Sequence, residues 1–242
     1  MGDSFPQVPQ RFLVVLAPSA LDGAVGGAAL GSGVEGLGLE GALLHEELVG
    51  LLGPRKGHFR YESGHHGDLW LEIPRLYLRP DRLRRFAAAL ARQLAAHGVE
   101  AVCGPLIEGA LLAQMVAEEL DVEFYFAEQF ARPRSDGLYP VGYRIPDALR
   151  PSARGKCAAI VDDVINAGSA VRGALADLQA CGAKPVVLGA LLVLGPPGPA
   201  FAAGVGVKLE TLAHLPRALW EPLACPLCAS GVLLEGGAKD GA

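Results

Sequence analysis

Short apolar runs alternate with longer amphipathic stretches along the middle of the chain. Apolar runs without polar alternation are typical of strands buried on both faces of a sheet. Such runs lie at 99–103, 122–126, 157–161 and 186–194. Helical spacing of apolar residues lies between them at 110–120 and 170–181. The pattern predicts an α/β fold, with a doubly wound, mostly parallel sheet flanked by helices and joined by right-handed crossovers.

The chain before these strands predicts two helices and a hairpin. Residues 42–51 place apolar side chains at helical spacing before a Gly-Pro stop, and a second helix starts at Pro80 and ends before Gly98. Between the two, residues 59–73 alternate apolar and polar positions around a Ser-Gly turn. This alternation is typical of two short antiparallel strands.

Composition divides the chain into four parts. The first forty residues are rich in glycine and show little periodicity, which is typical of a flexible linker. We expect an extension at 1–41, a helix and hairpin segment at 42–79, an α/β core at 80–213 with a long mobile loop at 127–155, and a C-terminal tail at 214–242.

Charge and cysteine content limit the classes of partner. The 242 residues include 21 Lys and Arg against 26 Asp and Glu, a net charge of −5, so the chain has no global positive field for nucleic acid or an anionic membrane surface. No apolar run approaches the roughly 20 residues that cross a bilayer. The five cysteines are an odd number, and three of them lie within or beside apolar runs. We therefore expect a cytoplasmic protein with reduced thiols, without nucleic-acid or membrane partners.

Candidate chemistry is densest after the predicted strand at 157–161. Asp162 and Asp163 are followed by a small-residue turn, Asn166 to Ser169, that leads into a helix. Amides at such a turn bind phosphate, whereas adjacent carboxylates repel phosphate but accept hydrogen bonds from vicinal hydroxyls. The pattern predicts a site for a 5-phosphorylated ribose. The alternative is helix capping by one of these side chains, which would use only a single carboxylate or the serine.

This segment resembles the phosphoribosyl-diphosphate motif of the type I phosphoribosyltransferases. Asn166 and Ser169 stand where that motif usually has threonine. The resemblance covers roughly 43–194 and is nearest to orotate phosphoribosyltransferases and their unassigned relatives. It implies a phosphoribosyltransferase core with a small hood, which is built from N-terminal segments and can also include a C-terminal segment. It also implies a homodimer, and Mg²⁺ that is carried by the phosphoribosyl diphosphate. The residues implied to bind phosphoribosyl diphosphate are Asp162, Asp163, Val164, Ile165, Asn166, Ala167, Gly168 and Ser169.

Three further segments match parts of the same family. The resemblance implies a diphosphate loop formed by Gly104, Pro105, Leu106, Ile107, Glu108 and Gly109. It implies a base-binding hood segment that includes Glu62, Ser63, Gly64, His65, His66 and Trp70. It also implies a lid within 127–155, where Arg132 and Arg134 would bind diphosphate. Trp70 would either stack on the base or be a buried core aromatic.

Two departures from the orotate enzymes change the expected substrate. Glu62 and Glu108 stand where those enzymes carry lysine, and residues 57–155 contain no lysine. Carboxylates in place of cations would repel orotate and diphosphate, which argues against orotate as the acceptor. We expect transfer of ribose 5-phosphate from phosphoribosyl diphosphate to another nitrogenous base with release of diphosphate, catalysed by Asp162, Asp163 and Glu108. The alternative is a non-catalytic sensor of phosphoribosyl diphosphate or a nucleotide.

Two smaller groups of residues invite a metal interpretation. His65, His66 and Asp68 are too close along one strand to converge easily, which favours contact with the base or sugar, or simple exposure, over metal binding. Cys225 and Cys228 form a single CxxC. Structural thiols are the favoured interpretation, ahead of zinc, which would need distant ligands such as His214, and ahead of redox chemistry. We assign no protein ligand to a metal from the sequence.

Overall fold

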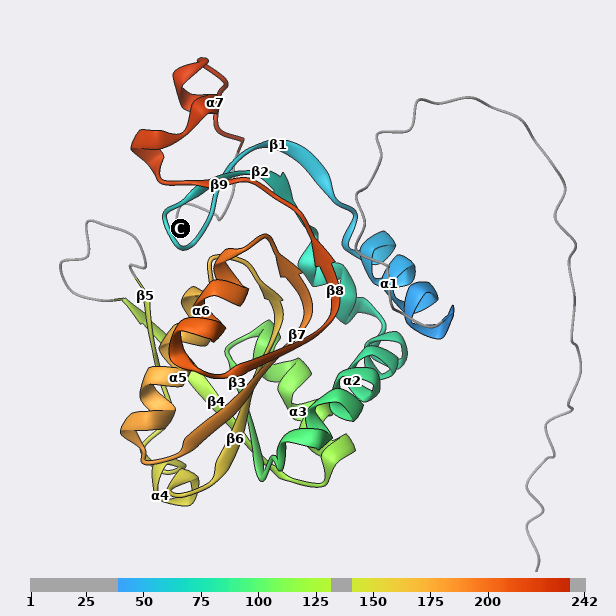
Figure 1. Ribbon diagram of the computed structural model, residues 1–242, viewed down its shortest axis with the longest axis vertical. Coiled ribbons are helices and arrows are strands. Elements are labelled where there is room, and N and C mark those ends of the chain that lie inside the picture. The colour runs from blue at the N-terminus through green and yellow to red at the C-terminus, as the bar shows by residue number, and fades with distance from the viewer. Residues whose placement is uncertain (1–38, 132–140, 236–242) are drawn as a thin grey trace, which may run out of the picture. The chain divides into compact units, whose positions relative to one another are not determined.

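A six-stranded sheet forms the centre of the protein. The computed structural model describes residues 39–131 and 141–235. The strand order is β5-β4-β3-β6-β7-β8, with β5 antiparallel at one edge and the other strands parallel (Figure 1). The strands are β3 (Ala101–Pro105), β4 (Glu123–Ala131), β5 (Val141–Arg144), β6 (Cys157–Ile165), β7 (Lys184–Leu194) and β8 (Lys208–Leu215). The predicted mostly parallel α/β sheet is confirmed.

Helices cover both faces of this sheet because its central strands are apolar on both sides. Ala159 and Val161 of β6 pack into the core on one face, whereas Ala158 and Ile160 pack into the core on the other. The first face is covered by α1 (Leu39–Leu52), α2 (Pro80–Leu94) and α3 (Glu108–Leu120). The second is covered by α4 (Arg150–Ala153), α5 (Ser169–Ala180) and α6 (Pro197–Val205).

A separate three-stranded antiparallel sheet forms the hood. Its order is β1 (Arg55–Arg60), β2 (His66–Trp70) and β9 (Leu219–Trp220), so the C-terminal segment does contribute to it (Figure 1). Short helical turns follow at η1 (Ile73–Leu78), η2 (Ala95–His97), η3 (Pro222–Ala224) and α7 (Pro226–Ala229). Among the described residues, no helix combines the length and the apolar character that crossing a membrane requires.

Some segments differ from the elements expected from the sequence. Residues 127–155 were expected to be one irregular loop, but the described parts contain the end of β4, all of β5 and α4. Tertiary pairing of β5 with β4 stabilises this extension, which a local pattern does not reveal. The strand β8 was also unpredicted, because its sequence neither alternates strictly between polar and apolar residues nor forms an unbroken apolar run. The predicted extension at 1–41 and the end of the predicted tail lie largely outside the described residues.

Candidate functional site

A cleft of about 370 Å³ opens where the loops after β3 and β6 meet. The helix after β3 leads to β4 on one side of the sheet, whereas the helix after β6 leads to β7 on the other, so the carboxyl ends of these neighbouring strands form a topological switch point. The hood segment closes the cleft from the other side. The predicted residues that line it are Glu62, Ser63, Trp70, Pro105, Leu106, Ile107, Glu108, Gly109, Asp162, Asp163, Val164, Asn166, Ala167, Gly168 and Ser169.

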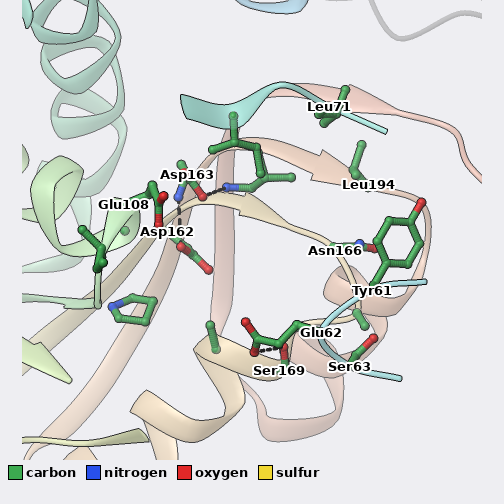
Figure 2. Close-up of a pocket in the computed structure, with 18 of the residues that line it drawn as sticks. Tyr61, Glu62, Ser63, Leu71, Glu108, Asp162, Asp163, Asn166, Ser169 and Leu194 are labelled. Carbon is green, nitrogen blue, oxygen red and sulfur yellow. Dashed lines mark hydrogen bonds between the residues drawn. The ribbon is translucent and has the colours of Figure 1, made fainter. Parts of the chain in front are cut away.

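The two adjacent carboxylates lie at the floor of the cleft and are buried (Figure 2). The amide of Val164 donates to Asp163 Oδ1 at 2.7 Å, and the amide of Asp163 donates to Asp162 Oδ1 at 3.1 Å. Burial raises the pKa of Asp163 to about 6, and burial together with the charge of Asp163 raises the pKa of Asp162 well above its ordinary value. Both acids lie within β6, which continues to Ile165 rather than ending before them as the sequence suggested.

The turn after β6 has the backbone and side chains of a phosphate loop. Gly168 has φ +81°, a left-handed conformation that favours glycine, and α5 begins at the next residue. The first amides of a helix have no intrahelical acceptor, which makes them donors for an anion. Among the described residues, the buried Oδ1 of Asn166 has no hydrogen-bond partner. A hydroxyl or N–H group of a ligand in the cleft would give Asn166 Oδ1 the donor that it lacks.

The loop after β3 is packed closely against the acidic pair. A Cβ on Gly109 would lie 2.5 Å from Asp162 Oδ1, so glycine is required for this approach. Glu108 begins α3 at the rim of the cleft, and its carbonyl oxygen accepts a hydrogen bond of 2.7 Å from the Tyr77 hydroxyl. The two predicted substrate loops are therefore in direct contact.

The hood places only part of its predicted residues at the cleft. Glu62 accepts hydrogen bonds from the Tyr143 hydroxyl at 3.1 Å and from the Ser169 hydroxyl at 3.4 Å, so it faces the phosphate loop (Figure 2). Trp70 lines the cleft and also packs on Phe59, with ring centroids 5.5 Å apart. The remaining predicted base-binding residues, Gly64, His65 and His66, are not among those that line the cleft.

Sequence reasoning missed Tyr77, which contacts the acidic pair, and it missed Tyr61, Tyr143 and Arg60, which line the cleft. The Tyr77 hydroxyl also lies 3.1 Å from Asp163 Oδ2, and Tyr143 contacts Glu62 from β5. Arg60 is the only Lys or Arg among the described residues that line the cleft. Tyrosines in loops and edge strands carry no periodic signal, so nothing in the sequence marks them. The predicted lid residues Arg132 and Arg134 lie outside the described residues.

Comparisons with known proteins agree with this geometry. The family model of the phosphoribosyl transferase domain matches residues 72–200. The orotate phosphoribosyltransferase of Thermotoga petrophila is 31% identical over 180 residues, covering 74% of this chain and 89% of that protein. The orotate phosphoribosyltransferase of Caldanaerobacter subterraneus is 28% identical over 187 residues, covering 76% of this chain and 90% of that protein.

Solved structures share the fold. The orotate phosphoribosyltransferase from Aeropyrum pernix has a TM-score of 0.54 at 20% identity, covering 71% of this chain and 93% of that one. Adenine phosphoribosyltransferase from Trypanosoma brucei, solved with AMP, pyrophosphate and ribose-5-phosphate, has a TM-score of 0.54 at 16% identity. The match covers 71% of this chain and 79% of that one. The match of the family model over more than half of the chain, on the fold and loops described above, shows that this chain belongs to the phosphoribosyl transferase domain family and is a phosphoribosyltransferase.

Proposed function

We propose that the enzyme transfers ribose 5-phosphate from phosphoribosyl diphosphate to a nitrogenous base that carries no negative charge. The observation that carries this proposal is the sign of the charges at the cleft. Glu62, Glu108, Asp162 and Asp163 all line it, against Arg60, the single Lys or Arg among the described residues that do so. Such a cleft disfavours an anionic base such as orotate and suits a neutral or weakly basic ring.

The acidic pair and the phosphate loop would hold the two ends of the sugar phosphate. The carboxylate oxygens of Asp162 and Asp163 would accept hydrogen bonds from vicinal ribose hydroxyls. The amides at the start of α5 and the side-chain amide of Asn166 would donate hydrogen bonds to the 5-phosphate. As positive charge develops at the anomeric carbon, the buried carboxylates stabilise it. Holding the sugar at both ends would also fix its reactive carbon relative to the base.

The residues of the cleft also fit a divalent cation. Asp162 and Asp163 are buried with raised pKa values, because their negative charges are unfavourable where they lie. Carboxylate oxygens are the ligands that Mg²⁺ prefers, usually together with substrate phosphates. Mg²⁺ would neutralise the diphosphate leaving group, with Asp162, Asp163 and Glu108 as the side chains able to hold it or its waters.

Glu62 would select the acceptor. Its carboxylate is positioned by the Tyr143 and Ser169 hydroxyls and faces into the cleft from the hood. A carboxylate accepts hydrogen bonds and repels anions, so it favours a base that presents N–H groups. Two like charges about 4 Å apart at a protein surface repel by about 4 kcal/mol, enough to disfavour orotate strongly.

Diphosphate release with a panel of acceptors tests the proposal. We expect turnover with phosphoribosyl diphosphate, Mg²⁺ and one of adenine, hypoxanthine, guanine or uracil, and a kcat/KM for orotate at least about tenfold lower. Glu62→Gln should narrow this difference, whereas Glu119→Gln at the exposed C-terminal end of α3 should not. Orotate as the best acceptor would overturn the proposal.

The same assay distinguishes the enzyme from a sensor. A sensor would bind phosphoribosyl diphosphate in calorimetry but release no diphosphate with any base. Membership of a transferase family and the complete acidic pair favour the enzyme.

A further inference from the structure

Four side chains that commonly bind metals converge on the hood, outside the residues that line the cleft. His58 lies on β1, His66 on β2, and Cys225 and Cys228 flank the start of α7, which lies beside the hood strands in Figure 1. One ligand atom from each of the four lies within 4.8 Å of all the others. We propose that these residues form a structural zinc site that fastens the C-terminal segment to the hood.

The distances between the ligand atoms match one tetrahedral ion. His58 Nε2 and His66 Nδ1 are 3.3 Å apart. Cys225 Sγ lies 3.4 Å from His58 Nε2, and Cys228 Sγ lies 3.6 Å from His58 Nε2 and 3.2 Å from His66 Nδ1. Tetrahedral zinc with ordinary bond lengths separates two nitrogens by about 3.3 Å, and a nitrogen from a sulfur by about 3.6 Å. The four atoms therefore surround a space that suits a single zinc ion.

A hydrogen bond to the backbone fixes the tautomer of His58 that a metal ligand requires. Its Nδ1 lies 2.8 Å from the carbonyl oxygen of Val232. A carbonyl can only accept, so Nδ1 carries the proton and the lone pair of Nε2 points toward the cluster. His58, His66 and Cys225 are buried, whereas Cys228 is exposed and leaves a path for the ion to enter.

The donor set favours zinc over other metals. Two thiolates and two neutral imidazoles suit zinc, whereas Mg²⁺ and Ca²⁺ prefer oxygen ligands. Binding would release one proton from each cysteine, and two thiolates would neutralise the charge of Zn²⁺. A two-iron cluster would hold the cysteines on one iron and the histidines on the other. Here each cysteine sulfur lies 3.2–3.6 Å from a histidine nitrogen, the spacing of ligands on one ion, which indicates a mononuclear site.

The site would brace the part of the hood that faces the substrate. His58 and His66 stand on either side of the turn at 61–65, which carries Glu62 and Ser63 into the cleft. Without a metal, the C-terminal segment is held to the hood by the two-residue strand β9, by the Ala218 amide that donates to Asp68, and by the backbone contacts of Glu235 with β1. Small sheets of this kind are only marginally stable. The zinc proposal rests on these contacts alone and holds whatever base the enzyme uses.

Metal analysis of the full chain tests the proposal without any mutation. The protein, purified under reducing conditions, stripped with a chelator and then supplied with Zn²⁺ alone, should retain one zinc ion per chain after desalting. With Co²⁺ in place of Zn²⁺, it should show the visible absorption of a tetrahedral site and the near-ultraviolet absorption of thiolate ligands. Absence of tight zinc binding, or a Co²⁺ spectrum without thiolate absorption, would overturn the proposal.

Variants then assign the ligands. Cys225→Ser combined with Cys228→Ser should abolish zinc retention, whereas Cys157→Ser, which changes a partly buried thiol of β6, should retain one zinc ion. In the wild-type chain, zinc removal should speed amide exchange at 55–70 and leave the central strand β6 unchanged. Full zinc retention by the double variant, or a Cys225–Cys228 disulfide in the freshly isolated protein, would show that the cysteines do not bind zinc.

Discussion

Replacing Asp163 with asparagine should stabilise the ligand-free enzyme while weakening substrate binding. Burial raises the pKa of Asp163 from 3.8 to about 6. The folded chain therefore holds a proton that the unfolded chain loses between about pH 4 and pH 6, and stability falls as the pH rises through this window. Above pH 6 this carboxylate costs about 3 kcal/mol of folding free energy.

Two hydrogen bonds to Asp163 reduce the stability that the asparagine is expected to add. Asp163 accepts from the Val164 amide and shares the single proton of the Tyr77 hydroxyl with the Glu108 carbonyl oxygen, and an asparagine can accept with only one oxygen. We expect Asp163→Asn to raise the free energy of unfolding by about 1–2 kcal/mol at pH 8, which corresponds to a rise in Tm of about 2–8 °C. Near pH 4 the gain should vanish, because the wild-type carboxyl is then protonated in the folded state.

Thermal melts at pH 4, 6 and 8, together with calorimetric titration of phosphoribosyl diphosphate with Mg²⁺, measure both effects. Binding should weaken at least about tenfold, because the amide replaces only part of the carboxylate. Asp147→Asn, on an exposed carboxylate paired with Arg144, is the control and should change neither quantity appreciably. A Tm lowered by Asp163→Asn equally at pH 4 and pH 8 would refute the charge argument, and unchanged binding would refute the assignment to the sugar.

Three further substitutions test the loops around this pair. Glu108→Lys should raise the affinity for phosphoribosyl diphosphate and reduce its dependence on Mg²⁺ in the same titration. Unchanged binding with lowered turnover would instead assign Glu108 to Mg²⁺ or to an arginine partner in catalysis, and no change in binding or turnover would show that the side chain points away from the substrate. Gly109→Ala should lower the free energy of unfolding by about 1–3 kcal/mol, because its Cβ would lie 2.5 Å from Asp162 Oδ1, and an unchanged denaturation midpoint would contradict this packing. Tyr77→Phe should lower the free energy of unfolding by about 1–2 kcal/mol at pH 8 and raise the pKa of Asp163 further, since the lost hydroxyl donates to that carboxylate. Equal melting temperatures of the variant and the wild type would contradict this prediction.

Periodicity and one motif predicted much of the fold and the centre of the cleft. The unbroken apolar run at 186–194 is a central strand, since only a strand covered on both faces lacks polar positions. Asp162 and Asp163 could be placed with the phosphate loop because all of them belong to one contiguous segment, and local sequence encodes the path from strand to turn to helix.

Contacts between distant segments could be decided only by the tertiary structure. His66 was grouped with its neighbours in sequence as a base-binding residue, yet its ring faces His58 and Cys228, which the hairpin and the pairing of β9 with β2 bring to it. Tyr77 reaches Asp163 through the packing of η1 against the core, with no periodic signal in the chain. A sequence pattern records which face of its own element a residue occupies, whereas the partner across a cleft or cluster depends on how separate elements pack.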